Sequence, residues 1–375
     1  MIYLDNAATT KPNARALDEA RAYLTERYFN PSALYREGFE LHLELKAARE
    51  HILSCLADPA AFELIFTSCG TEADNQAIFS FARRGNAVTT SGEHAAVANP
   101  FAELKSRGVE PRFAPLNADG SVNAEKLLDL IDDKTSFVSV IHVNNETGAI
   151  NDVNAIAKAV KEKNPRVVFH TDGVQSFGKL PYRIGKDVDL YSLSAHKIGG
   201  LKGVGALICK KKLRLSPYLY GGGQEGGLRS GTENVFGIKT LEFAALEKYG
   251  GRREKYERMQ ELRRRFFERL DGSLFAKISS DSSSPYILSL VARGLRGEIL
   301  LHRVNDRGLL IGTGSACSSN AKKRYSRVIL ACGVSERDAD GVIRLSFSDE
   351  TTEEELGEAA KILNEEARSL SEDMQ

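Results

Sequence analysis

The chain of 375 residues has no excess of charge of either sign, because 51 lysines and arginines balance 51 aspartates and glutamates. A protein built mainly to bind nucleic acid needs a clear basic excess, and so does a polybasic protein of the membrane surface. The sequence therefore argues against both classes, and we expect no direct nucleic-acid partner and no membrane partner. Hydrophobic residues make up 42% and charged residues 27% of the chain, which is typical of a globular protein and not of a disordered one.

Long apolar runs are also missing, since no stretch approaches the ~18–20 residues that a transmembrane helix needs. The opening residues, MIYLDNAATT, contain an acid at Asp5 and no basic stretch before an apolar core, so we expect no signal peptide. Cysteines are few and scattered, without a metal-like C-x-x-C pair: Cys55, Cys69, Cys209, Cys317 and Cys332. We therefore expect no disulfide framework, no metal site and a cytoplasmic localisation.

Short apolar runs rich in valine, isoleucine and phenylalanine alternate with segments of helical period. The runs at 62–66, 87–90, 137–143, 167–170 and 205–209 predict buried strands, and 72–82, 124–131 and 153–163 predict helices. This alternation predicts an α/β fold, with a mostly parallel sheet covered by helices on both faces. In such sheets, ligand sites gather at the carboxyl ends of the strands.

The pattern changes after Tyr249. The charged segment 250–270 carries an apolar stripe and predicts a solvated helix that bridges two domains. Beyond it, apolar runs at 285–291, 308–311 and 342–347 predict the strands of a smaller α+β unit. We predict a large domain over residues 12–250, and a small domain formed by residues 1–11 and 251–375.

The segment 191–200, YSLSAHKIGG, joins an apolar strand to Ser-Ala-His-Lys and two glycines. A lysine at a strand end, beside a hydroxyl, an imidazole and glycines, is well placed to form a Schiff base with an aldehyde cofactor. Ser194 and His196 can donate hydrogen bonds to a phosphate held nearby. On this segment alone, Lys197 is equally compatible with a surface lysine in a turn.

Asp172 follows an apolar strand in the segment 167–178, VVFHTDGVQSFG. A carboxylate there can pair with a protonated pyridine nitrogen and keep the ring an electron sink. Gln175, three residues on, can hydrogen-bond a ring oxygen. The alternative is a helix N-cap aspartate, but a second strand that ends in Lys197, about 25 residues later, favours the cofactor interpretation.

Two glycine-containing segments add candidate anion-binding groups. In FTSCGTEADN at 66–75, a strand is followed by a helix, whose first N–H groups and Thr71 hydroxyl can bind an anion; many βα turns share this pattern. The segment 221–232, GGGQEGGLRSGT, contains Arg229, Ser230 and Thr232. A flexible linker would seldom hold so many polar groups.

With these residues, nine ordered motifs resemble one family over almost the whole chain. They are YLDNAATT at 3–10, FNPSA at 29–33, FTSCGTEADN at 66–75, GEHAAV at 92–97, HVNNETG at 142–148, TDGVQSFGKLP at 171–181, SAHKIGG at 194–200, LRSGTEN at 228–234 and GSACSS at 314–319. The set resembles the cysteine desulfurases of the NifS/IscS type, in the class V branch of pyridoxal-phosphate enzymes with the aminotransferase fold type I. This resemblance implies pyridoxal 5'-phosphate as cofactor, L-cysteine as substrate, a homodimer and a sulfur-acceptor protein as partner.

The resemblance also assigns roles to individual residues. It implies that Lys197 carries the cofactor, that Asp172 faces the pyridine nitrogen and Gln175 the phenolate oxygen, and that His94 stacks over the ring as a catalytic residue. The phosphate would be bound by Gly70, Thr71, Ser194 and His196, with Thr232 reaching in from the partner subunit. Asn145 would lie at the cofactor and, with Arg344, would hold the substrate carboxylate. As ordinary residues, a capping histidine, an asparagine before a turn and an arginine on a strand are each common.

Cys317 lies in GTGSACSS at 312–319, a run of small residues in the predicted small domain. A thiolate there could attack a cofactor-bound substrate and pass its sulfur to a partner protein. The implied reaction converts L-cysteine to L-alanine and leaves a persulfide on Cys317, which serves iron–sulfur cluster assembly or the thiolation of tRNA or cofactors. The alternatives are a selenocysteine lyase, a class V aminotransferase or a non-catalytic sulfur-binding scaffold protein; Lys197, Asp172 and His94 argue against the last.

Overall fold

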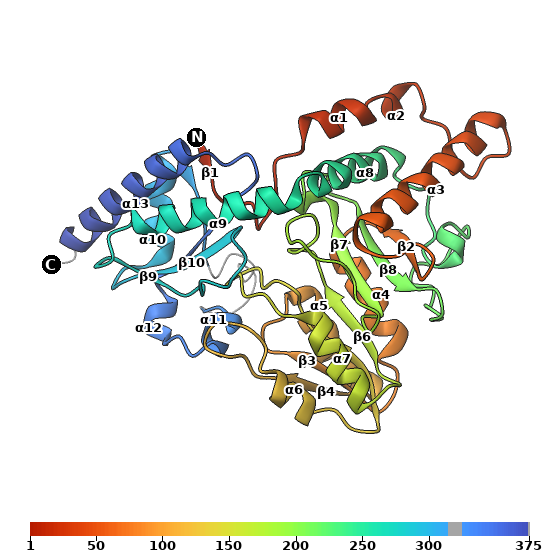
Figure 1. Cartoon of the computed structure of the whole chain (residues 1–375), viewed down its shortest axis with the longest axis horizontal. Helices are drawn as coiled ribbons and strands as arrows, with labels where there is room; N and C mark the ends of the chain where they lie inside the picture. Colours follow the sequence, from red (N-terminus) through yellow and green to blue (C-terminus); the bar gives the residue numbers. More distant parts are fainter. Residues whose placement is uncertain (314–324, 374–375) are drawn as a thin grey trace.

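A computed structural model describes residues 1–313 and 325–373, which form two main sheets, a separate pair of short strands and the covering helices (Figure 1). The large sheet has seven strands in the order β2 (Phe62–Thr67), β8 (Gly205–Lys210), β7 (Leu190–Ser194), β6 (Val168–Asp172), β5 (Thr135–Ser139), β3 (Asn86–Thr90) and β4 (Glu110–Ala114). Five neighbouring strands, from β7 to β4, are parallel, and β8 runs antiparallel to both β7 and β2. The carboxyl ends of all strands but β8 therefore meet at one edge.

Helices cover both faces of this sheet. Neighbouring residues of a strand point to opposite faces, and here the side chains on both faces are apolar, so both faces need a covering layer. On β8, for example, Ile208 packs in one apolar cluster and Leu207 in another. The helices of this region are α1 (Ala14–Ala20), α2 (Ala22–Thr25), α3 (Arg36–Leu56), α4 (Gly70–Phe81), α5 (Ala95–Leu104), α6 (Ala124–Asp129), α7 (Val153–Lys163) and α8 (Val235–Tyr249). The helices α3 and α8 pack on one face, and α4 and α5 on the other.

The second sheet is antiparallel, in the order β12 (Gly312–Thr313), β13 (Val342–Ser346), β10 (Ile287–Ala292) and β9 (Phe275–Lys277). Its helices are α9 (Arg252–Glu268), α10 (Gly297–Asp306), α11 (Arg327–Ala331), α12 (Glu336–Ala339) and α13 (Glu353–Asp373). The N-terminus joins this unit, since β1 (Ile2–Tyr3) pairs in parallel with β11 (Leu309–Leu310), and Figure 1 shows the N-terminus beside α13.

The predicted fold class is confirmed: a large, mostly parallel sheet is combined with a smaller antiparallel sheet and helices. The strand expected over 137–143 is wrong at its end, because β5 stops at Ser139, although the N–H groups of Val140 and His142 still donate to the His170 and Asp172 carbonyls of β6. The charged segment 250–270 forms α9 as predicted. The residue boundaries of the two expected domains stay a prediction. In the described part of the chain, no helix is both long enough and apolar enough to span a bilayer.

Candidate active site

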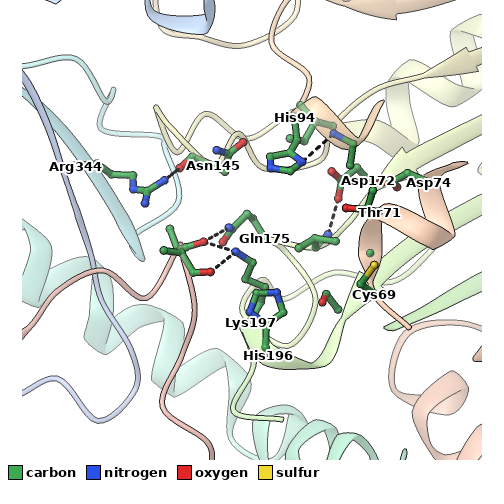
Figure 2. A pocket seen from close by; sticks show the side chains of 17 residues that line it. Cys69, Thr71, Asp74, His94, Asn145, Asp172, Gln175, His196, Lys197 and Arg344 are labelled. Carbon is green, nitrogen blue, oxygen red and sulfur yellow. Dashed lines mark hydrogen bonds between the residues drawn. The ribbon is translucent and has the colours of Figure 1, made fainter. Parts of the chain in front are cut away.

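A cavity of about 340 Å³ opens at the carboxyl ends of the parallel strands (Figure 2). The structure brings together ten of the residues predicted for the site: Gly70, Thr71, His94, Asn145, Asp172, Gln175, Ser194, His196, Lys197 and Arg344 all line it. They come from turns and strand ends across the large sheet, and Arg344 comes from β13 of the small sheet. The cavity therefore lies between the two sheets, where side chains of both can reach one bound molecule.

Lys197 is held by the N-terminal segment of the chain. It lies in a 3-10 turn (Ala195–Lys197) directly after β7, so its amine points along the strand end into the cavity. Its Nζ donates hydrogen bonds to the carbonyls of Ala7, at 2.6 Å, and Ala8, at 2.8 Å, as Figure 2 shows. Both of these acceptors are neutral backbone carbonyls, and the Lys197 amine also interacts electrostatically with Asp172.

Asp172 is the last residue of β6 and is buried beneath the cavity. Its Oδ1 accepts the N–H of Val174 at 2.9 Å. Burial raises the pKa of Asp172, while His94, the Val174 N–H and Lys197 lower it. A second carboxyl, Asp74 on α4, also lines the cavity, and its pKa is raised well above the usual value by burial and by Asp172. The pair therefore favours one anion and one neutral acid.

His94 is fixed as a neutral imidazole with a defined tautomer. It is the N-cap of α5, and its Nδ1 accepts the N–H of Ala96 at 3.1 Å. An acceptor nitrogen carries no proton, so the proton of the neutral ring is on Nε2. Burial lowers the pKa of His94 and so favours the neutral ring, although Asp172 acts in the opposite direction. Figure 2 shows the imidazole close to Asp172 at the cavity wall.

The groups expected to hold a phosphate fit an anion. Ser194 Oγ is buried and has no hydrogen-bond partner among the described residues, although it lines the cavity. The helix α4 begins beside it at Gly70, and its N-cap, Cys69, makes no side-chain cap. A Cβ on Gly70 would come within 2.7 Å of Val174 Cγ2, so only glycine allows this close approach. Bare helix N–H groups and an unpaired hydroxyl together suit a phosphate.

His196 completes this side of the cavity. Its Nδ1 lies 3.2 Å from Thr9 Oγ1, and burial together with Lys197 lowers the pKa of His196 to about 4. The ring is therefore neutral at physiological pH, and it contributes hydrogen bonding rather than charge to an anion.

Arg344 forms the opposite wall of the cavity. Its guanidinium donates to the carbonyl of Asn145 at 2.9 Å and to Asp5 Oδ1 at 2.7 Å. The Nε of Arg344 is buried and has no acceptor in the part of the chain that the structure describes. A Cβ on Gly312 would lie 2.9 Å from Arg344 Nη2, so glycine leaves room for the guanidinium. A buried cationic donor without an acceptor suits a carboxylate.

Among the described residues, one that was predicted for the site does not line this cavity. Thr232 is exposed and lines a separate pocket beside Arg229 and Glu233, which is compatible with a role toward another subunit. Cys317 lies outside the described residues, so its predicted role stays a prediction.

The sequence reasoning missed several groups that line the cavity or contact its lining residues: the Ala7 and Ala8 carbonyls, Asp5, Asp74 and Lys179. Asp5 and Asp74 lie within the motifs that were recognised, but they touch the site only through folding of distant segments. Lys179 donates from a buried position to Gln175. The only sequence signal for it was an isolated lysine within the otherwise apolar and small residues of SFGKLP.

Comparisons with known proteins identify the family of the chain. The family model Aminotransferase class-V matches residues 2–358. A NifS/IcsS protein homolog of Lactobacillus delbrueckii subsp. bulgaricus is 36% identical over 96% of this chain and 95% of its own. Cysteine desulfurase IscS of Dictyoglomus turgidum is 34% identical over 99% of this chain and 96% of its own.

Solved structures show the same fold. A NifS-like protein superposes with a TM-score of 0.90 at 34% identity, covering 99% of each chain. SspA, solved in complex with cysteine, has a TM-score of 0.81 at 29% identity, covering 94% of this chain and 100% of that one. The chain belongs to the aminotransferase class-V family. Within that family it belongs to the NifS/IscS type of cysteine desulfurases, which are pyridoxal-phosphate-dependent enzymes.

Proposed function

We propose that this protein takes the sulfur atom from L-cysteine, releases L-alanine and holds the sulfur as a persulfide on Cys317. The proposal rests on the contacts of the residues that flank the segment 314–324 in the chain. On one side, Gly312 pairs in register with Arg344. On the other, Ser326 donates a hydrogen bond to Glu146, which follows Asn145. Arg344 and Asn145 both line the cavity, so each attachment is to a lining residue or to its neighbour, and Cys317 is four residues along the chain from Thr313.

The cavity fits pyridoxal phosphate. Lys197 supplies the amine for its aldehyde, and Asp172 and Gln175 supply groups for the ring nitrogen and ring oxygen. Gly70, Thr71, Ser194 and His196 would hold the phosphate, and His94 would cover the ring. When bound, the cofactor offers an aldehyde that an amine can capture and a ring that stores electrons released at the substrate Cα.

The protein's own groups divide the remaining work. Arg344 and the Asn145 side chain orient the substrate carboxylate, so that the amino group and Cα face Lys197. The Lys197 amine, once released from the cofactor, takes the proton from Cα and returns it during alanine formation. A neutral His94, with its proton on Nε2, can donate to the substrate without adding a charge to the site.

Sulfur transfer needs a nucleophile outside the cofactor. The Cys317 thiolate attacks the substrate sulfur and forms an S–S bond, while the C–S bond breaks and its electron pair stays with the carbon skeleton. That skeleton takes up a proton and leaves as alanine. The outer sulfur then passes to an acceptor protein of iron–sulfur cluster assembly or of tRNA or cofactor thiolation.

The test uses Cys317→Ser in the full chain. The variant should bind pyridoxal phosphate, keep its yellow colour and change spectrum when L-cysteine is added, yet release almost no alanine. The wild-type protein, incubated with L-cysteine without reductant, should gain one or more sulfur atoms on the Cys317 peptide. Normal alanine release by Cys317→Ser, or added sulfur on the Cys69 peptide instead, would show that Cys317 is not the nucleophile.

We also propose that the enzyme is a cytoplasmic homodimer. Large apolar side chains are exposed in the single chain along residues 24–43, including Tyr28, Leu34, Phe39 and Leu43. The segment that contains Thr232 adjoins this region, because Arg49 on α3 forms an ion pair with Glu225 at 2.7 Å. A surface of this kind supports association with a second copy, which would bring its Thr232 toward the phosphate. Cys55, Cys69, Cys209 and Cys332 are free thiols, which suits a reducing compartment.

Thr232→Ala tests the shared site. Loss of one hydrogen bond to a charged phosphate should weaken cofactor retention by about 1–2 kcal/mol, with the dimer intact in sedimentation. A wild-type monomer with full cofactor occupancy and activity would contradict the shared site.

A further inference from the structure

The side chain of Lys179 lies behind the cavity wall and has no role in the proposed reaction. It is a lysine of which only 5% is exposed, in the turn that follows β6 and Asp172. Among the described residues, its Nζ has one hydrogen-bond acceptor, Gln175 Oε1, at 3.1 Å. Burying a lysine amine costs free energy, and the cost here is offset in part by a hydrogen bond to a residue that lines the cofactor cavity.

The contact decides which end of the Gln175 amide faces the cavity. A protonated lysine only donates hydrogen bonds and a neutral amine still carries N–H donors, so Lys179 is matched to the carbonyl oxygen of the amide, which is the atom that it contacts. The amide nitrogen is thereby turned the other way, where Nε2 donates to the Ala7 carbonyl at 2.8 Å. That same carbonyl accepts from Lys197 at 2.6 Å. The chain of contacts runs from Lys179 through Gln175 and Ala7 to Lys197.

An amide nitrogen has two N–H groups, and the Ala7 carbonyl takes only one of them. Gln175 is itself buried and lines the cavity, so the second N–H is the polar group that it can offer to a ring oxygen. If the amide were reversed, its carbonyl oxygen would face a phenolate oxygen, and the two acceptors would repel each other. The orientation of this one amide therefore decides between stabilising and destabilising the negative ring oxygen.

We propose that Lys179 is a positioning residue that fixes the Gln175 amide with its N–H side toward the cofactor's ring oxygen. This inference rests on the proposed function, since it concerns the bound state of the same cavity.

The charges around Lys179 are consistent with a positioning role. Burial and then Lys197 lower the pKa of Lys179 to about 7; Lys248 and Arg344 act in the same direction, and Asp349 opposes them. Lys179 is therefore only partly protonated near neutral pH, and it supplies little fixed positive charge to the cavity. Its bond to Gln175 is the contribution that remains.

The test is a pH titration of the visible absorbance of the protein loaded with pyridoxal phosphate. A donor to the ring oxygen stabilises its negative charge and lowers the pH midpoint of the absorbance change. Lys179→Met, which keeps the length of the side chain but removes its donor, should raise the midpoint by about one pH unit, a typical value for one hydrogen bond to a charged group. Gln175→Leu should raise it by a similar amount.

A double variant distinguishes positioning from a separate effect. If Lys179 acts through Gln175, then Lys179→Met combined with Gln175→Leu should have the midpoint of Gln175→Leu alone. Lys248→Met is the matched control, because it removes a neighbouring lysine charge that is paired with Asp349 and does not contact Gln175; its midpoint should stay near that of the wild type. An unshifted Lys179→Met, an additive double variant, or an equal shift in Lys248→Met would overturn the inference.

A second measurement requires neither the cofactor nor a folded Lys179 variant. Gln175→Glu retains an acceptor for Lys179, so the apoprotein should be at least as resistant to urea as Gln175→Leu. If Lys179 did not bond residue 175, the buried carboxylate would lack a partner, and Gln175→Glu would be the less stable of the two. A wild-type protein without any cofactor absorbance would contradict the proposed function, whereas absorbance with an unshifted midpoint contradicts only the role of Lys179.

Discussion

The surface of α9 and the cavity between the two main sheets are both rich in charged and polar groups. On α9 these groups are exposed and paired, whereas some in the cavity are buried and unpaired. On α9, Arg264 pairs with Glu261 at 2.7 Å and with Glu268 at 2.5 Å, and all three side chains are about half exposed. In the cavity wall, Ser194 Oγ and Arg344 Nε are buried without hydrogen-bond partners among the described residues. Exposed ion pairs contribute little to stability because water screens them, whereas buried polar atoms without partners are costly. The cavity therefore retains polar groups for a ligand at the expense of stability.

The largest expected effect is that of Lys197→Ala. Without the amine, the cavity cannot anchor the cofactor aldehyde or move the Cα proton, so the yellow absorbance should be lost and alanine release should fall by roughly 10²–10⁴-fold or more. Visible absorbance and alanine assays measure both effects, and Lys202→Ala, an exposed lysine five residues on, is the control. Normal absorbance and turnover in Lys197→Ala would refute its assignment.

Glu93→Gln should give the next largest effect, on stability. Burial raises the pKa of Glu93 to about 8, against the Ile141 N–H and the Thr90 hydroxyl. The folded protein keeps this proton between pH 4.5 and 8 while the unfolded chain loses it, so wild-type stability falls as pH rises through that window. A glutamine does not titrate, so the free energy of unfolding of the variant should rise relative to that of the wild type by roughly 1–3 kcal/mol between pH 5 and pH 8.

Urea unfolding of the apoprotein at the two pH values measures this difference. Glu103→Gln, a change at an exposed glutamate, is the control and should follow the wild type at both pH values. A stability difference between Glu93→Gln and wild type that does not grow with pH would mean that Glu93 is ionised in the folded protein.

Ser194→Ala should separate binding from stability. Because Ser194 Oγ has no partner in the described chain, its removal should not lower the urea midpoint of the apoprotein. Cofactor affinity should fall about tenfold, since a hydrogen bond to a charged group is lost. Ser192→Ala is the matched control: its Oγ lies 2.9 Å from His170 Nε2, so it should destabilise the fold and spare the cofactor. If Ser194→Ala and Ser192→Ala destabilised the apoprotein equally, the Ser194 hydroxyl would have a structural role in the absence of cofactor, contrary to the prediction.

The smallest effect is expected on the charged surface. Arg264→Ala removes a side chain with two close ion-pair partners, yet the urea midpoint should not change measurably at physiological salt, because the pairs are exposed. A clear loss of stability would mean that the α9 charges act as a cooperative network, and it would narrow the difference between the two regions.

Much of the cavity could be predicted because its residues lie in local patterns. Asp172 and Lys197 each follow an apolar strand, and parallel strands bring their carboxyl ends to one edge. The fold class followed from the same alternation of strand and helix. The strand expected over 137–143 was too long, since an apolar run does not reveal where the regular strand conformation ends, here at Ser139.

The rest of the cavity depends on contacts between segments far apart in the sequence. Asp5 meets Arg344 across 339 positions, and Ala7 meets Lys197 across 190. No periodicity or composition encodes such pairs. Lys179 is a similar case, because a single lysine in a turn is ordinarily exposed and only packing shows that it is buried against Gln175.

The pairing of β1 with β11 has a consequence for how the enzyme is made. Ile2 pairs with Leu309 and Asp5 with Ser346, so the N-terminal segment cannot pair until these distant residues have been synthesised. At about 5–20 residues per second, ribosomal synthesis leaves the first strand without them for roughly 15–60 s. The large sheet, complete by residue 210, can fold during that interval. The nascent chain thus acquires its scaffold early, and the Ala7 and Ala8 carbonyls that hold Lys197 gain their anchorage only when translation is nearly finished.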